Sequence, residues 1–226
     1  MSRNPFPQPA KPKPPTAAHR ALHKLIHGKA PKKKVDRRVR KTRDALGDAL
    51  ITLIQEKPFD SITIQQVLDR AGVGRSTFYA HYSGKEDLFL TDVEEFFEMM
   101  AMALSGQGDK SNRVAPVQEF FAHVAEGAKF ISALKDSQKL HDVFELGRGH
   151  FARGIEARLA AFPATLSLNS SARAARAHGL AGAFFSMLDW WLSHQSAATP
   201  QQMDELFHQL VWKGLAPAAA APKAGS

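Results

Sequence analysis

The sequence predicts an all-α protein, with a helix-turn-helix in its N-terminal part and a helical bundle after it. Apolar residues recur at spacings of three and four over most of residues 36–216, and no alternating run of strand length appears. The composition, 44% apolar and 23% charged over 226 residues, is that of a chain that buries a sizeable core in one or two compact units. Caps and breaks divide the pattern into separate helices.

Both ends of the chain are predicted to be disordered. Residues 1–35 hold seven of the thirteen prolines, and this density of proline, together with positive charge, opposes folding. Residues 1–43 contain fourteen Lys and Arg and one acidic residue, whereas the whole chain has a net charge of only +8. A basic arm on a mildly acidic body indicates a polyanion partner for the arm. Residues 217–226 form an Ala- and Pro-rich tail.

Residues 36–90 form the first predicted unit. Its first helix ends before Pro58, because the proline ring crowds the helical backbone that precedes it. Thr63 and Gln66 have the spacing of a capping box that starts the second helix. Gly72-Val73-Gly74 interrupts that helix, and residues 75–82 form a third, short one. Two short helices joined by a glycine turn behind a longer helix describe a helix-turn-helix.

Residues 91–216 form the second predicted unit, and a long helix from Ser83 leads into it. An apolar stripe from Val117 to Ile131 predicts the next helix, and a stripe over residues 140–159 predicts another. A break follows at residues 163–171. The last helix begins at Thr199-Pro200, where a capping residue and a proline at the first helical position coincide.

The third short helix carries side chains suited to reading DNA. An α-helix with its side chains is about as wide as the major groove, so an exposed short helix can enter it. Phe78 is expected to pack inward on Val67 and Leu68, which turns its neighbours outward. The predicted DNA-binding residues are Thr63, Arg75, Ser76, Thr77, Tyr79, His81, Tyr82, Lys85 and, near the start of the first helix, Arg38, Arg40 and Lys41.

The sequence predicts one role for some of these residues and leaves two roles open for others. Arg75 can form a forked pair of bonds to guanine or contact a phosphate. Tyr82 is either a phosphate ligand or a ring packed under the motif. Lys85 stands in the first turn of the next helix, where backbone amides and the helix dipole attract an anion, and this position favours a phosphate contact. The basic arm either touches the duplex or stays a solvated tail.

The run SITIQQVLDRAGVGRSTFYAHYSGKEDLF, residues 61–89, resembles the DNA-binding signature of the tetracycline-repressor (TetR) family. The resemblance extends from about Val39 to Leu90. It implies a homodimeric repressor of the bacterial cytoplasm that binds a palindromic operator on double-stranded DNA and is released by a small-molecule effector. Gly74 departs from the family pattern, which often has a Ser or Thr cap there. The residues that match the contacting positions of the family are Arg75, Thr77, Tyr79, His81 and Lys85.

The bundle is expected to supply a dimer interface and an effector pocket. Apolar residues on two sides of the helix around Trp190 and Trp191 indicate burial on two sides, as in a four-helix interface between two copies. The predicted interface residues are Phe184, Met187, Leu188, Trp191, Met203, Leu206, Phe207 and Leu210. The predicted pocket residues are Phe121, His141, Phe144, His150, Phe151 and Trp190.

Catalysis and metal binding are not expected. The chain has no cysteine, which excludes disulfides, thiolate zinc sites and a cysteine nucleophile. The histidines lack the spacing of a metal site, and no nucleophile elbow, phosphate loop or carboxylate pair is present. No cofactor, catalytic residue or membrane partner is therefore predicted. Two alternatives remain: a constitutive DNA-binding regulator without an effector, and a helical interaction protein whose helix-turn-helix does not bind DNA.

Overall fold

The computed structural model describes residues 37–102, 112–162, 165, 167–194 and 198–215, and these are helical, without a strand. The predicted all-α fold is confirmed for this part of the chain. The predicted arm, 1–35, and tail, 217–226, lie outside the described residues. The elements are α2 (Arg37–Ile54), the 3-10 turn η1 (Phe59–Ser61), α3 (Ile64–Ala71), α4 (Arg75–Tyr79), α5 (Lys85–Met102), α6 (Val117–Glu126), α7 (Ala128–Asp136), α8 (Leu140–Leu159), α9 (Ser170–Ser193) and α10 (Pro200–Leu215).

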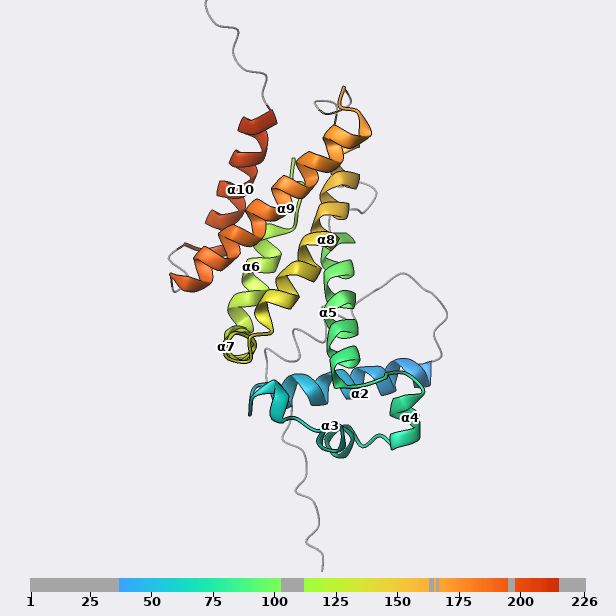
Figure 1. Ribbon diagram of the computed structural model, residues 1–226. Coiled ribbons are helices and arrows are strands. Elements are labelled where there is room, and N and C mark those ends of the chain that lie inside the picture. Colours follow the sequence, from blue (N-terminus) through green and yellow to red (C-terminus); the bar gives the residue numbers. More distant parts are fainter. Residues whose placement is uncertain (1–36, 103–111, 163–164, 166, 195–197, 216–226) are drawn as a thin grey trace, which may run out of the picture.

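Figure 1 shows two parts joined by one long helix. The helices α2, α3 and α4 form one part, and α5 runs from it into the bundle, where it packs along α8. Helix α9 packs on α8, and α10 packs on α6. Helix α2 also contacts α7, so the two parts touch beside the connecting helix as well as through it. None of the helices in the described ranges has both the length and the apolarity needed to cross a membrane.

The first part is held together by one apolar face of α2. Leu46, Leu50 and Leu53 are buried on this face, and Val67 and Leu68 of α3 are buried against the same core. Each such side chain contributes on the order of 1.5–3 kcal/mol when it is removed from water. The two helices therefore share one apolar core.

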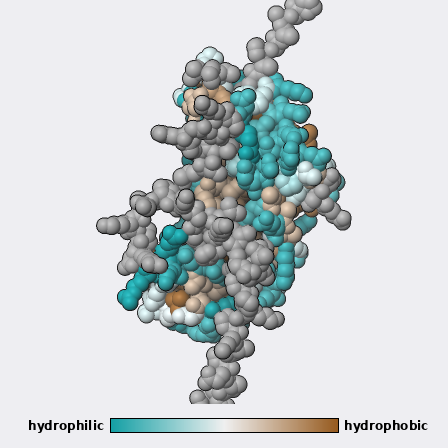
Figure 2. All heavy atoms as spheres, turned by 180° about the vertical axis from the view of Figure 1, so that it is seen from behind, coloured by the Kyte–Doolittle hydropathy of each residue, from teal (hydrophilic) through white to brown (hydrophobic). Residues whose placement is uncertain are grey.

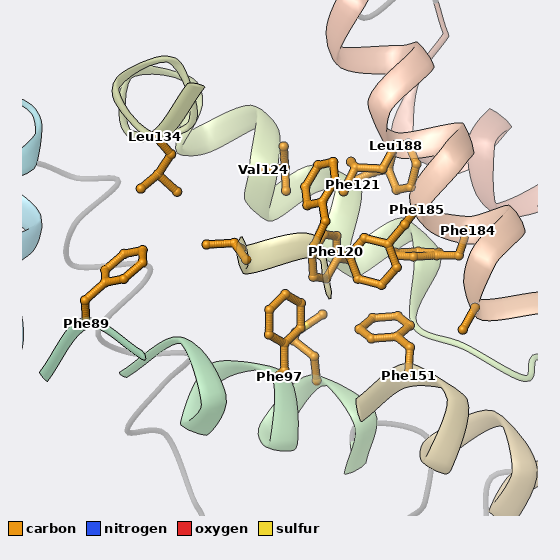
Figure 3. Close-up of a cluster of buried hydrophobic side chains, with 14 of the residues drawn as sticks. Phe89, Phe97, Phe120, Phe121, Val124, Leu134, Phe151, Phe184, Phe185 and Leu188 are labelled. Carbon is orange, nitrogen blue, oxygen red and sulfur yellow. The ribbon is translucent and has the colours of Figure 1, made fainter. Parts of the chain in front are cut away.

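Phenylalanine rings fill the core of the bundle. Phe97 of α5 lies parallel to Phe120 of α6, with 6.0 Å between ring centroids, and Phe151 of α8 stacks on Phe184 of α9 at 4.4 Å. Figure 3 shows these rings, together with Phe185, gathered between α5, α6, α8 and α9. The rings interlock in edge-to-face and stacked pairs, an arrangement that adds roughly 0.5–1.5 kcal/mol per pair beyond simple burial.

Glycine lets α8 approach this cluster closely. A Cβ atom on Gly147 would lie 2.5 Å from Cζ of Phe97 and would also collide with the ring of Phe185. Since both rings are buried, neither has room to retreat. The backbone of α8 therefore packs directly on the two aromatic rings.

Two helices differ from the sequence-based expectation. The stripe from Val117 to Ile131 is split into α6 and α7 at Gly127, a residue of low helix propensity whose carbonyl accepts bonds that start the next helix. Helix α4 ends at Tyr79 instead of Tyr82. Its final residues form a tighter turn, because the N–H groups of His81 and Tyr82 both donate to the Phe78 carbonyl at 2.9 Å.

Five of the predicted interface residues lie in the core of their own subunit. Their side chains are almost completely buried within the bundle, so they cannot also contact a second copy. These residues are Phe184, Leu188 and Trp191 of α9 and Met203 and Phe207 of α10. Leu206 and Leu210 of α10 are half exposed, and Met187 is partly buried. The face seen in Figure 2 is mainly hydrophilic where its atoms are coloured, with small scattered apolar patches.

Candidate functional site

The turn between α3 and α4 is defined by a cap and a left-handed glycine. The Thr63 hydroxyl accepts from the Gln66 N–H at 3.3 Å, and the Gln66 side chain accepts from the Thr63 N–H at 3.0 Å, so the predicted capping box is present. Helix α3 ends at Gly72 with φ 66°, a conformation that costs glycine little. The chain thereby turns sharply into α4.

Helix α4 is fixed to the protein by Phe78. This side chain is fully buried, and its ring meets Tyr79 edge-on at 5.3 Å and Tyr82 at 5.7 Å. With one side anchored, the other side of the short helix faces outward. The exposed side chains on and just after it are Arg75, Ser76, Thr77, Tyr79 and His81.

Arg75 is oriented by a residue of the preceding helix. Its guanidinium donates to Oε1 of Gln65 at 3.0 Å, and the Gln65 amide donates in turn to Asp69 at 2.8 Å. Gln65 thus belongs to the same exposed surface, although the sequence analysis did not include it. A contact across ten residues and a turn leaves no local pattern that would reveal it.

Tyr82 is a packed ring and not a surface phenol. It is 3% exposed, and its hydroxyl accepts from Nε of Arg43 at 3.1 Å. Burial raises the pKa of the phenol, against the opposing effect of the Arg43 hydrogen bond. Of the two roles that the sequence left open, the structure has the packed ring, so Tyr82 is removed from the candidate DNA contacts.

Lys85 also differs from expectation. Its ammonium donates to the carbonyl oxygens of Phe59 at 2.9 Å, Asp60 at 3.2 Å and Ile62 at 2.9 Å. It lies 4.8 Å from the centroid of the Phe59 ring. An ammonium has three N–H donors, and here all three are used. In this structure Lys85 ties α5 to the α2–α3 connection instead of pointing its charge at a phosphate.

The other predicted DNA contacts lie around the same surface. Arg38, Arg40 and Lys41 are exposed in the first turns of α2, and Thr63 is exposed at the start of α3. The candidate nucleic-acid interface therefore consists of α4, the cap of α3 and the basic start of α2.

A second candidate site is a cavity at the seam between the two parts, here called the seam cavity. It encloses about 970 Å³ of empty space, its open mouth included. Helix α2 contributes Leu50 and Ile51 to its wall, the turn just after α2 contributes Gln55, and the remaining wall comes from the connecting helix and the bundle. These further lining residues are Phe89, Asp92, Val93, Phe96, Phe97, Phe120, His123, Val124, Gly127, Phe130, Ile131, Leu134, Val143, Phe144, Leu188 and Leu192.

Two titratable side chains interrupt the apolar wall of the seam cavity. Burial, together with the nearby Glu95 carboxylate, raises the pKa of Asp92 to about 8, and Arg43 opposes the shift. Burial lowers the pKa of His123 to about 4, and its Nδ1 has no hydrogen-bond partner among the described residues. Asp92 also lies so close to Gly47 of α2 that a Cβ atom there would collide with its carboxylate.

The seam cavity is not where the sequence analysis expected the pocket. Of the six predicted residues, only Phe144 lines it. Phe121 and Phe151 are buried among other rings, and His150 is buried with Nε2 3.6 Å from Glu94. The other two are on the outside: His141 is exposed, and Trp190 is 47% exposed on the outer side of α9.

Comparison with known proteins places these features in a family. A model described as "Bacterial regulatory proteins, tetR family" matches residues 46–91. A curated relative from Bacillus subtilis (strain 168), the uncharacterized HTH-type transcriptional regulator YxbF, is 38% identical over 73 residues. The alignment covers 31% of this chain and 19% of that relative. A TetR transcriptional regulator from Streptococcus agalactiae 2603V has a similar structure, with a TM-score of 0.53 and 26% identity over 78% of this chain and 96% of the other.

Residues 46–91 therefore belong to the DNA-binding domain of the TetR family. A further solved structure, described as a TetR-family transcriptional regulator of Syntrophomonas wolfei, shares the fold with a TM-score of 0.58 and 17% identity. It covers 80% of this chain and 98% of the other. The TetR family model spans the second half of α2, the helix-turn-helix and the start of α5. It includes α3, α4 and the cavity residues Leu50, Ile51 and Gln55, but not the basic start of α2.

One residue of the sequence could have pointed to the seam cavity, and the sequence analysis did not use it. Asp92 interrupts an apolar stripe on α5 that includes Phe89, Val93 and Phe96, and an acid in such a stripe faces a buried surface. No group of three His, Asp or Glu side chains within the described ranges is arranged to hold a metal ion.

Proposed function

We propose that this TetR-family protein is a sequence-specific DNA-binding transcriptional regulator. Residues 36–90 would bind double-stranded DNA, and residues 91–216 would bind the effector and a second copy. The observation that supports this most directly is the anchored α4, whose buried Phe78 leaves Arg75, Thr77 and Tyr79 exposed on one outward surface. A protein that controls bacterial genes acts in the cytoplasm, where the DNA is.

The contacts have distinct expected roles. Arg75 reads a base edge or a phosphate, Ser76 and Thr77 offer hydroxyls, and Tyr79 and His81 contact the backbone of the duplex. The Arg38, Arg40 and Lys41 side chains add phosphate contacts that are independent of sequence. Because base contacts specify and phosphate contacts position, changes on α4 should affect specificity more than changes at the start of α2.

The protein is further proposed to act as a homodimer on a palindromic operator. Two recognition helices have to lie about 34–36 Å apart to enter successive major grooves. Apolar side chains exposed on α9 and α10 support self-association: Trp190 is 47% exposed, and Leu206 and Leu210 are each 52% exposed. On α9, Gly179 and Gly182 have open space where a Cβ would lie, which permits close approach of another helix.

A test of the dimer compares two leucines of similar exposure. Leu206→Lys should convert a dimer into a monomer, as measured by light scattering coupled to size-exclusion chromatography. Leu90→Lys, at a leucine of α5 that is 44% exposed, should leave the dimer intact. A wild-type particle that is monomeric at all concentrations would contradict the proposal.

Regulation is proposed to work by release of the operator when an effector occupies the seam cavity. The cavity has walls on α2 and on the bundle, so a ligand within it contacts the DNA-binding part directly. An effector shifts the protein between two states only by its difference in affinity for them, so it must bind the form that does not fit the operator more tightly. On this proposal the regulator is a repressor.

DNA binding is tested by selecting a consensus from a randomised DNA library with the full chain. Affinity for the selected site is then measured by fluorescence anisotropy. Arg75→Ala should weaken binding by about tenfold or more, in line with the roughly 1–3 kcal/mol of a good base contact. Tyr79→Ala should have a similar effect, in line with the roughly 1.5–3 kcal/mol of a hydrogen bond to a charged phosphate. Arg70→Ala is the control, because this exposed arginine of α3 pairs with Glu56. Failure to enrich any sequence would favour a helical interaction protein instead.

A further inference from the structure

We infer that the seam cavity binds a mainly apolar small molecule whose protonated amine faces Asp92. As an account of regulation this inference rests on the proposed function, whereas binding of such a molecule to the cavity does not. The inference combines the shape and lining of the cavity, the charges around Asp92 and the unused hydrogen-bonding atom of His123.

The body of the ligand is defined by the wall. Apart from Gln55, Asp92 and His123, the side chains that line the cavity are aliphatic or aromatic. They come from α2, α5, α6, α7, α8 and α9, so a molecule inside would be surrounded on several sides. Apolar atoms gain most from such a transfer out of water, and a few polar groups then fix the orientation.

The sign of the ligand charge follows from the groups around Asp92. Among the residues that the structure describes, no Lys or Arg lines the cavity. Asp44 and Asp48 of α2 and Glu95 of its own helix act on Asp92 in the same direction, and the guanidinium of Arg43 opposes them. Arg43 already donates to Tyr82 and to Glu95. An ammonium group therefore enters a region of negative potential, whereas a carboxylate would be repelled.

His123 provides the second polar point of the cavity. Its imidazole is neutral near pH 7, because burial lowers its pKa to about 4, so it does not repel a cation. Its Nδ1 atom is buried without a hydrogen-bond partner among the described residues, and it can accept a bond in the tautomer that is protonated at Nε2. A second N–H or an O–H on the ligand would satisfy it.

Asp92 also connects the ligand to the DNA-binding part. Its carboxylate lies against the backbone of α2 at Gly47, where there is no room for a side chain. A protonated amine beside Asp92 favours the ionised carboxylate. Since burial raises the pKa of Asp92 to about 8 in the empty protein, binding at pH 7 should release a proton. The charge at the α2–α5 contact changes as a result.

The test uses three probes with one apolar body: 4-phenylbutylamine, 4-phenylbutanol and 4-phenylbutanoate. Each is titrated into the full chain by calorimetry at pH 7. We expect the amine to bind at least about tenfold more tightly than the alcohol, because its hydrogen bond to the carboxylate is charge-assisted, and the carboxylate to bind most weakly. Titrations in buffers of different ionisation enthalpy should show up to about one proton released with the amine and about none with the alcohol.

Two variants locate the effect. Asp92→Asn should remove the preference for the amine and leave affinity for the alcohol within about twofold. Glu98→Gln, the same chemical change on the exposed side of α5, should keep the preference. Ile131→Trp narrows the cavity and should weaken all three probes, with its fold checked by circular dichroism.

The inference is overturned if none of the probes binds, if amine and alcohol bind equally, if the carboxylate binds best, or if Asp92→Asn keeps the amine preference. The regulatory part is tested separately by adding the amine to the selected DNA complex. If the amine binds in the cavity but leaves DNA affinity unchanged, the ligand class is supported and the effector role in the proposed function is contradicted.

Discussion

Arg43 of α2 donates from Nε to the hydroxyl of Tyr82 over 3.1 Å. Another nitrogen of the same guanidinium donates to Glu95 on α5. One side chain thereby joins the first helix, the end of the α4 turn and the connecting helix. The orientation of α4 relative to the bundle depends on these contacts, because α4 itself has only five residues.

Tyr82→Phe should therefore destabilise the protein by about 0.5–1.5 kcal/mol, since it removes the hydroxyl that accepts from Arg43 and keeps the ring. The free energy of unfolding is measured by urea denaturation. Tyr79→Phe is the matched control, because the Tyr79 side chain is 51% exposed. Equal destabilisation by both substitutions would show that the Arg43–Tyr82 bond contributes nothing particular.

Lys85→Met should destabilise the protein by about 1–3 kcal/mol, because three carbonyl groups lose their donor. The dependence of DNA affinity on salt should keep its slope, as expected for a lysine that makes no phosphate contact. Lys135→Met, at an exposed lysine of α7, is the control for stability. A slope reduced by about one in the Lys85 variant would restore this residue to the DNA interface.

Gly147→Ala should cost about 1–3 kcal/mol of stability, because the added methyl group would collide with the rings of Phe97 and Phe185. Gly149→Ala in the same helix is the comparison. Its nearest neighbour would be an Arg153 nitrogen at 3.5 Å, an ordinary contact, so this change should be neutral or stabilise the helix by up to about 1 kcal/mol. A stable Gly147 variant would mean that the core can open more easily than its packing indicates.

Stability should fall as the pH rises from about 6.5 to 8, in the ligand-free protein. In this window the folded chain keeps a proton on Asp92, whose pKa is raised to about 8, whereas the unfolded chain has lost it. Because the unfolded state binds fewer protons, a rise in pH favours unfolding. The free energy of unfolding should fall by up to about 2 kcal/mol across this window. The groups that face Asp92 are Arg43, Asp44, Asp48 and Glu95.

Between about pH 4 and 6.5 the effect of Asp92 is opposed by His123. Because the pKa of His123 is lowered in the folded protein, this side chain is protonated at a higher pH in the unfolded chain than in the folded one. The contribution of His123 to the free energy of unfolding therefore rises with pH. Urea denaturation at half-unit pH steps measures both effects. Asp92→Asn should flatten the decline above pH 6.5, and an unchanged decline in this variant would assign it to other groups.

Deletion of residues 1–35 should reduce the salt dependence of DNA affinity. The prediction comes from the basic composition of the first 43 residues, since each lysine or arginine at a phosphate releases counterions. The measurement is the slope of log affinity against log salt for the selected DNA site. A variant of full length with the lysines of residues 29–34 replaced by glutamine separates charge from chain length, and an unchanged slope in both variants would exclude contact by the arm.

Local features of the fold could be predicted because their causes are local. The Thr63 cap, the Gly72 turn and the buried Phe78 each depend on residues within a few positions along the chain. The end of α4 was less predictable. It depends on how Tyr82 is drawn inward to Arg43, which is 39 residues away.

The predictions at the candidate sites were wrong where contacts between distant residues decide the position of a side chain. Lys85 was expected at a phosphate from its place in a first turn, yet its partners are carbonyls 23 to 26 residues earlier. Trp190 and Trp191 are neighbours in sequence, and only packing against α6 determines that Trp191 is inside and Trp190 outside. The described wall of the seam cavity comes from six helices, so the apolar pattern of any one helix does not predict the cavity.

The seam cavity has a consequence for protein engineering. Leu50, Ile51, Gln55 and Phe89 all lie within residues 37–90, so a chimera that takes this segment from another family member also receives four foreign side chains on the cavity wall. Grafting a new DNA reader onto this bundle would thereby alter chemical recognition. The two halves of such a hybrid are interchangeable only if those four positions are restored along with the graft.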